Sequence, residues 1–174
     1  MSAFPDWQKF VIPQRRPLSG CIPTGYEMLL RAAGIPGIDF TTFQDDFDLD
    51  KDLKPGDTPR NNFDSVGGAI NQKYPHVRFK RVVFSKGEGD KKLQFVKNSI
   101  SNHRLVLVSL NRLPIFNKAV WHIMPVVDVD DVNLYLLYVV QDNGGIQIMT
   151  LPKKEFVRIH EEFDGGDDVA YFEE

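Results

Sequence analysis

The order of apolar patterns along the chain constrains its fold more than any other feature of the sequence. Helical periods dominate the N-terminal part, and runs of β-branched and other apolar residues dominate the rest. We expect helices over 21–33, 62–72, 91–101 and 152–160, and strands over 77–84, 105–110, 122–129, 134–140, 145–151 and 169–172. We expect residues 1–20, which contain three prolines, to run extended over the surface.

The polar stretch 130–133 separates the apolar stretches 122–129 and 134–140 and therefore predicts a β-hairpin. A helix-rich part followed by a mostly antiparallel sheet is an α+β layout. The 174 residues fit a single domain over 1–174, with an Asp-, Pro- and Gly-rich excursion over 35–60.

The chain contains one cysteine, which excludes an intrachain disulfide and zinc sites built on two or more thiolates. The net charge of −3 and the pI of about 5.8 give no overall attraction to nucleic acid or to an anionic membrane. The longest apolar run has seven residues, far fewer than the ~18 that span a bilayer. The first residues lack the pattern of a secretory signal, so we expect a cytoplasmic protein, without excluding export by a dedicated secretion machine.

Charge is unevenly distributed along the chain. Residues 71–104 hold nine Lys and Arg against two acids, residues 39–57 hold seven Asp against two Lys, and residues 155–174 hold eight acids against one Arg. We expect these segments to lie near one another in the fold and to neutralise one another. The alternative is a basic face that binds an acidic partner.

We expect neither a metal site nor a cofactor. The aspartates of 46–57 imitate a calcium-binding loop, but Lys51 occupies the position of its turn glycine, so we expect a solvated acidic loop. His160 begins a pattern similar to a zinc-protease helix, but the second histidine of that pattern is missing.

Cys21 lies at the start of the strongest helical pattern in the chain. Pro23 suits the first turn, and Gly34 followed by Pro36 ends the helix. A thiol reacts as the thiolate, which the partial positive charge and the N–H groups of a helix N-terminus stabilise. Because Cys21 interrupts no apolar stripe, the sequence favours a nucleophile over a buried structural cysteine, the commonest state of an unpaired cysteine.

A nucleophilic thiol needs a base, and the base needs a group that orients it. If the hairpin turn is centred on residue 132, His122 stands opposite Asp142, close enough for the carboxylate to hold an imidazole N–H. A register shifted by one residue replaces Asp142 with Asn143, whose amide oxygen can do the same. The pattern therefore predicts a pair of His122 with Asp142 or Asn143.

Four segments stand in a set order along the chain: Gln14, the helix start CIPTGYEMLL, the strand start WHIMPVV and the strand end YVVQDNGG. In this order they resemble the papain-like cysteine peptidase superfamily, and most of all its bacterial double-glycine leader peptidase branch. The resemblance implies an N-terminal catalytic helix and a helical half packed on an antiparallel β-sheet. It also implies Cys21 as nucleophile, His122 as general base and acid, Asp142 as the residue that orients the imidazole, and Gln14 as a donor to the oxyanion hole.

Two residues depart from the pattern of that superfamily. Ile22 replaces the small glycine that usually follows the nucleophile, and Gln14 lies seven residues before Cys21, slightly farther than usual. The resemblance implies a hydrolase that cleaves an amide or isopeptide bond of a peptide or protein substrate through a thioester. Two alternatives are an acyltransferase or transglutaminase-like enzyme that uses the same residues, and a papain-like domain that only binds a partner.

Overall fold

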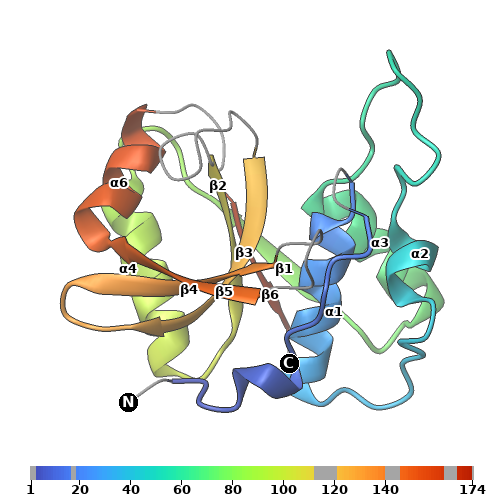
Figure 1. The fold of residues 1–174 in the computed structure, drawn as a ribbon, viewed down its shortest axis with the longest axis horizontal. Helices are drawn as coiled ribbons and strands as arrows, with labels where there is room; N and C mark the ends of the chain where they lie inside the picture. The colour runs from blue at the N-terminus through green and yellow to red at the C-terminus, as the bar shows by residue number, and fades with distance from the viewer. Residues whose placement is uncertain (1–2, 17–18, 112–120, 140–145, 163–167, 174) are drawn as a thin grey trace.

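The computed structural model describes residues 3–16, 19–111, 121–139, 146–162 and 168–173 (Figure 1). Their helices are the 3-10 helix η1 (Trp7–Lys9) and the α-helices α1 (Cys21–Ala33), α2 (Phe43–Phe47), α3 (Phe63–Lys73), α4 (Gly89–Ser101) and α6 (Lys153–Glu162). Their strands are β1 (Phe79–Val83), β2 (Val106–Asn111), β3 (Trp121–Val129), β4 (Asn133–Val139), β5 (Ile146–Pro152) and β6 (Asp168–Phe172). Each helix and strand expected from the sequence is present, with ends that differ by no more than two residues.

Two sequence-based expectations about individual segments hold only in part. Residues 1–20 do not simply run extended over the surface, because they include η1 and the buried Phe10 and Gln14. The acidic excursion is a solvated loop only in part, because residues 51–60 are exposed, whereas 43–47 form α2 and Asp48 and Asp50 are buried. In both segments, aromatic side chains pack on the core around α1 and carry their polar neighbours inward.

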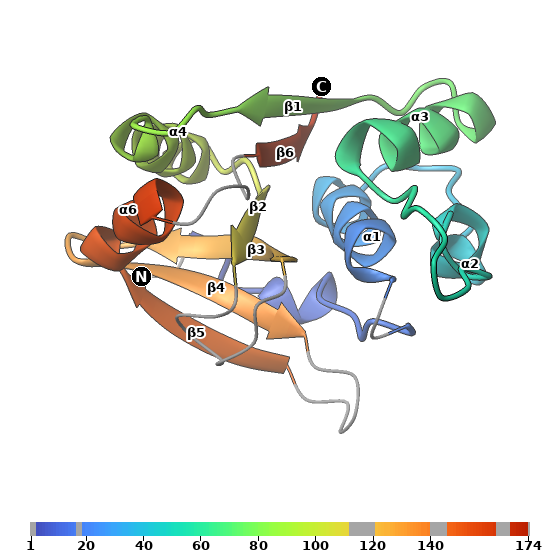
Figure 2. The same cartoon turned by 90° about the horizontal axis from the view of Figure 1, so that it is seen from above.

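The six described strands form one antiparallel sheet in the order β1-β6-β2-β3-β4-β5. Helices α1, α2 and α3 lie on one side of this sheet and α4 and α6 on the other, as Figure 2 shows. Alternate residues of β3 therefore enter different cores: Ile123 packs with α1, and Met124 packs with α4 and α6. This is the α+β layout expected from the sequence.

The hairpin of β3 and β4 is present, but its register differs from the expected one. The Asp130 amide donates to the Asn133 carbonyl, and the Asp130 carboxylate accepts from the amides of Val132 and Asn133, so the turn is centred between residues 131 and 132. Val129 consequently pairs with Leu134, and a bulge between Val126 and Asp128 shifts the pairing once more. The assumption that placed Asp142 opposite His122, a turn centred on residue 132, is therefore wrong.

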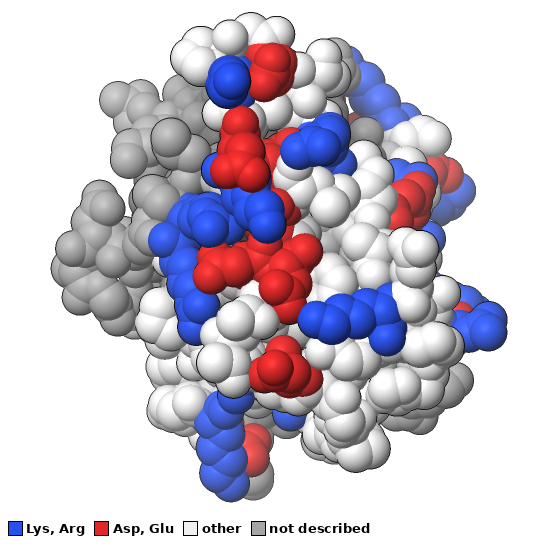
Figure 3. Space-filling model, turned by 90° about the vertical axis from the view of Figure 1, so that its right-hand side faces the viewer, with Lys and Arg blue, Asp and Glu red and all other residues white. Residues whose placement is uncertain are grey.

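The charged segments do neutralise one another. Lys73 forms an ion pair with Asp46 at 2.9 Å, and Lys80 forms one with Glu173 at 2.7 Å, so the basic segment contacts both acidic ones. Figure 3 shows Lys and Arg interleaved with Asp and Glu over one face of the molecule. None of the helices in the described part of the chain is long and apolar enough to cross a membrane.

Candidate active site

Cys21 is the first residue of α1, as the sequence predicts, but its side chain is half-buried against the core around α1 rather than exposed. The preceding residue, Gly20, lies against Arg16: a Cβ on Gly20 would stand 2.9 Å from the Arg16 carbonyl oxygen. Gly20 has no side chain that could cap α1. The N–H groups of the first turn, near the thiol, therefore receive no side-chain acceptor from residue 20.

The first turns of α1 lie directly on β2 and β3. A Cβ on Gly25 would stand 2.8 Å from Leu107 Cδ1 and 3.5 Å from Ile123 Cγ2, so only glycine permits this approach without displacement. Gly25 is one helical turn beyond Cys21, and Ile123 follows His122. The contact therefore brings the start of α1 and the start of β3 to the same end of the molecule, which is the upper end in Figure 1.

His122 is buried near the start of β3, with 7% of its surface exposed. Its ring meets the Tyr138 ring of β4 edge to face, with centroids 5.1 Å apart. Strand alternation places the His122 side chain with Met124 rather than with Ile123. By this alternation His122 is on the face of the sheet that α4 and α6 cover, as its contact with Tyr138 also indicates, whereas α1 packs on the opposite face through Ile123.

Gln14 is folded back towards the nucleophile although it stands seven positions before Cys21 in the chain. Its side chain is 4% exposed, and its Nε2 donates to the Arg16 carbonyl oxygen at 2.6 Å. The Gly20 amide donates to the same oxygen at 2.9 Å. The Gln14 amide therefore lies close to the residue that precedes Cys21, and its second proton is chemically able to serve another acceptor.

The remaining expected positions have different outcomes. Asp142 and Asn143 lie outside the described residues, so a partner of His122 from either position stays a prediction. Ile22 is half-buried and packs against the core around α1.

Several residues that hold this region had no recognisable pattern in the sequence. Gln44 of α2 contacts the backbone on both sides of Gln14, and Asp48 and Asn61 contact Ser19. Their partners lie 29 to 42 positions away in the chain, so no local motif could have identified them.

A buried carboxylate lies near the base of this region. Glu27 of α1 is 3% exposed, and burial raises the pKa of Glu27 although hydrogen bonds from Arg31 and Gln44 oppose the shift. Arg31 Nη2 and Glu27 Oε1 are 2.9 Å apart. Glu27 stands six residues, about 1.7 helical turns, beyond Cys21 in α1.

The described residues contain no group of three or more His, Cys, Asp and Glu side chains that could hold a metal ion. Instead, Asp50 accepts hydrogen bonds from the amides of Arg60 and Asn61 at 2.8 and 2.9 Å. His160 Nε2 lies 2.9 Å from the Ser85 carbonyl oxygen. In the acidic excursion, the Asp50 carboxylate thus accepts hydrogen bonds from backbone amides of the protein itself.

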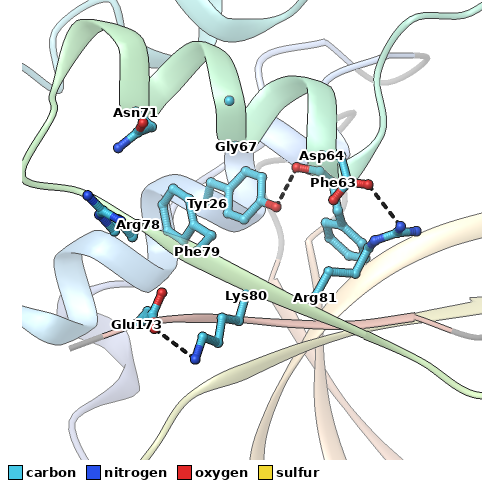
Figure 4. A pocket seen from close by; sticks show the side chains of 11 residues that line it. Tyr26, Phe63, Asp64, Gly67, Asn71, Arg78, Phe79, Lys80, Arg81 and Glu173 are labelled. Carbon is cyan, nitrogen blue, oxygen red and sulfur yellow. Dashed lines mark hydrogen bonds and ion pairs between the residues drawn. The ribbon is translucent and has the colours of Figure 1, made fainter.

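A separate depression of about 360 Å³ lies between α3 and β1 (Figure 4). Its lining includes the ion pairs Arg81–Asp64 at 2.8 Å and Lys80–Glu173 at 2.7 Å. Tyr26 contributes from α1, but Cys21, His122 and Gln14 do not line this depression. It is therefore distinct from the region around the thiol.

No family model matches this chain, and no curated protein matches it. Among solved structures, the chain is similar to a protein from Bacillus anthracis whose assignment as a C39-like peptidase is itself provisional. The match has a TM-score of 0.61 and 13% sequence identity, and it covers 97% of this chain and 96% of that chain. It confirms the expected papain-like α+β fold, in which a helical half packs on an antiparallel sheet.

Proposed function

We propose that this protein is a cysteine peptidase that cleaves an amide or isopeptide bond of a peptide or protein substrate through a thioester on Cys21. His122 serves as general base and acid, Asp142 orients its imidazole, and Gln14 donates to the oxyanion. The close approach of α1 at Gly25 to Leu107 and Ile123 carries the proposal, because it places the start of α1 beside β2 and the start of β3. The position of Gln14 beside the residue before Cys21, and the likeness of fold to the Bacillus anthracis protein, support it further.

The reaction proceeds by acyl transfer to sulfur and then to water. His122 takes the thiol proton, and the Cys21 sulfur attacks the substrate carbonyl carbon. The resulting oxyanion accepts hydrogen bonds from Gln14 Nε2 and from the Cys21 amide, donors that act on charge present only in the tetrahedral intermediate. His122 then protonates the leaving amine, and it deprotonates the water that releases the acid and regenerates the thiol.

Alkylation of the single thiol tests the Cys21–His122 pair. One equivalent of iodoacetamide at neutral pH should label Cys21 faster than free cysteine, and His122→Ala should slow labelling about a hundredfold. The matched control is His76→Ala, because His76 is exposed and contacts the Pro36 carbonyl oxygen. Mass spectrometry measures the rates, and equal rates in the wild type and His122→Ala contradict the proposed pair.

Peptide cleavage tests the reaction itself. The wild type is incubated with a library of peptides from digested proteome, and new termini are counted by mass spectrometry against Cys21→Ala as the blank. New termini that require Cys21 are the expected result, and their absence rejects the peptidase. Addition of glycine methyl ester to the same reaction separates hydrolysis from acyl transfer, because a transferase attaches this amine to the product.

A further inference from the structure

We propose that Gln44, Asp48 and Asn61 form a polar clamp that sets the position of the oxyanion donor Gln14 relative to the nucleophile Cys21. These three are positioning residues, since none is proposed to touch the substrate. The inference rests on the proposed function for the roles of Gln14 and Cys21. The inference gives the segment between α1 and α3, which contains these three residues, a role in positioning the reacting groups.

Gln44 holds the backbone on both sides of Gln14. Its Nε2 donates to the Pro13 carbonyl oxygen at 3.0 Å, and its Oε1 accepts from the Arg15 amide at 2.9 Å. Thr24 Oγ1, in the first turn of α1, lies 2.8 Å from the same Gln44 oxygen. One buried amide thus ties the segment that carries Gln14 to the helix that begins at Cys21.

Asp48 and Asn61 hold the chain just before the nucleophile. Ser19 Oγ donates to Asp48 Oδ2 at 2.6 Å, and Asn61 Nδ2 donates to the Ser19 carbonyl oxygen at 2.8 Å. Asn61 Nδ2 also donates to Asp48 Oδ1 at 2.8 Å, so the two clamp residues support each other. Arg16 Nη1 stands 3.5 Å from Asp48 Oδ2, and the Asp48 side chain is 1% exposed.

The clamp itself is anchored by apolar packing. Phe43 and Phe47 flank Gln44 in α2, are 0% and 3% exposed, and pack in the core around α1 with ring centroids 4.7 Å apart. Because this five-residue helix is anchored in the core, the backbone that carries the Gln44 side chain has a fixed position. The separation of seven positions between Gln14 and Cys21 in the sequence gives no such fixed position, because it is compatible with many distances between the two residues.

An oxyanion hole needs donors whose positions are fixed relative to each other. Its donors must meet one oxygen at about 2.7–3.1 Å, and a displacement of about 1 Å is enough to lower the rate greatly. Gln14 and the Cys21 amide belong to different segments, and the polar clamp contacts both segments. Loss of the clamp should therefore impair steps that pass through an oxyanion and spare steps that need only the thiolate.

Two reagents separate these steps. Acylation by p-nitrophenyl acetate passes through a tetrahedral oxyanion, whereas alkylation by iodoacetamide does not. We expect Gln44→Met, which removes the hydrogen bonds with little change of volume, to lower the acylation rate at least about fivefold and to leave alkylation within about twofold. The matched control is Gln94→Met on the exposed side of α4, which should change neither rate.

A double-mutant cycle distinguishes positioning from general destabilisation. If Gln44 acts through Gln14, then Gln14→Ala combined with Gln44→Met is acylated no more slowly than Gln14→Ala alone. The inference is overturned if the effects of Gln14→Ala and Gln44→Met on the acylation rate multiply. It is also overturned if Gln44→Met lowers acylation and alkylation in parallel, or if Gln44→Met is acylated within twofold of the wild-type rate. Should Gln44→Met fail to fold by circular dichroism, Gln44→Asn and Ser19→Ala replace it under the same criteria.

The same measurements separate the clamp from the proposed function. A wild type that cleaves no peptide but is acylated by p-nitrophenyl acetate rejects the peptidase, and the cycle still decides on the clamp. A wild type that is alkylated but not acylated overturns both, because the clamp then has no oxyanion donor to position.

Discussion

Cys21 and His122 belong to two regions of the molecule that hold their side chains by different means. The region before Cys21 is fixed by hydrogen bonds between side chains and backbone, such as those of Gln44 with Pro13 and Arg15. The region of His122 is fixed by strand pairing and by packing against the Tyr138 ring. Directional bonds set positions in an irregular loop, whereas a sheet already provides a regular frame and needs only packing.

This difference predicts how the two regions respond to change. Substitutions in the hydrogen-bonded region should alter reaction rates more than the free energy of unfolding. Substitutions in the packed region should alter both together, because packing and geometry there depend on the same contacts.

The largest effect is expected where the two regions meet, at Gly25. Gly25→Leu forces a side chain into the contact with Leu107 and Ile123, so it should lower the free energy of unfolding by about 2–3 kcal/mol and slow the alkylation of Cys21. Urea unfolding and iodoacetamide labelling measure the two quantities. Gly68→Leu is the control, because a Cβ there meets nothing within 4 Å, and a stability loss at Gly68 equal to that at Gly25 would contradict the close contact.

A smaller effect is expected from the ring beside His122. Tyr138→Leu removes the edge-to-face contact at 5.1 Å, so it should cost about 1 kcal/mol and slow alkylation about threefold by loosening the imidazole. Tyr138→Phe keeps the ring and should retain most of the stability and most of the alkylation rate. If Leu and Phe variants behave alike in denaturation and labelling, the ring contact does not hold His122.

The smallest effect is a difference in acid titration between the two regions. Burial raises the pKa of Glu27 in α1, so the folded state holds that proton more tightly than the unfolded chain. The hydrogen bond from the Tyr135 hydroxyl, with those from the Asn133 and Val132 amides, lowers the pKa of Asp130 in the hairpin turn from 3.8 to about 2. The stability contribution of Glu27 therefore declines as pH rises above about 4.5, whereas that of Asp130 is present above 3.8 and is lost towards about 2.

Denaturation of Glu27→Gln and Asp130→Asn between pH 2 and 7 measures this contrast. Relative to the wild type, Glu27→Gln should gain stability as the pH rises. Asp130→Asn should be less stable at pH 6, with a difference that shrinks towards pH 2. Parallel curves for a variant and the wild type would show that the carboxyl concerned does not have the shifted pKa.

The helices and strands could be predicted because their signals are local. Gly34 ends α1 with a φ of 66°, as expected for a glycine just beyond a helix. The apolar stretches 122–129 and 134–140 and the polar turn between them indicated the hairpin. The register could not be predicted, since the Asp130 carboxylate and a bulge at Val127 shift it, and neither has a signature in the apolar pattern.

The candidate site divides in the same way. Cys21 at a helix start follows from local sequence, whereas the pairing of His122 was derived from a turn position that proved wrong. The polar clamp was invisible, because the acidic composition around Asp48 suggested solvation and Asn61 belongs to no recognised motif. Buried polar residues of this kind are recognised only when their distant partners are known.

The sequence by itself determined which segments form helices and strands, where the single thiol stands in the first helix, and the α+β class. These properties depend on periodicity, capping residues and residue type over short stretches of chain. The tertiary structure alone decided that Gly25 brings α1 onto Ile123, that Gln14 folds back to Arg16 and that Gln44 holds the segment around Gln14. These contacts join residues far apart in the chain, and their geometry depends on how the helices pack on the sheet, which no local pattern records.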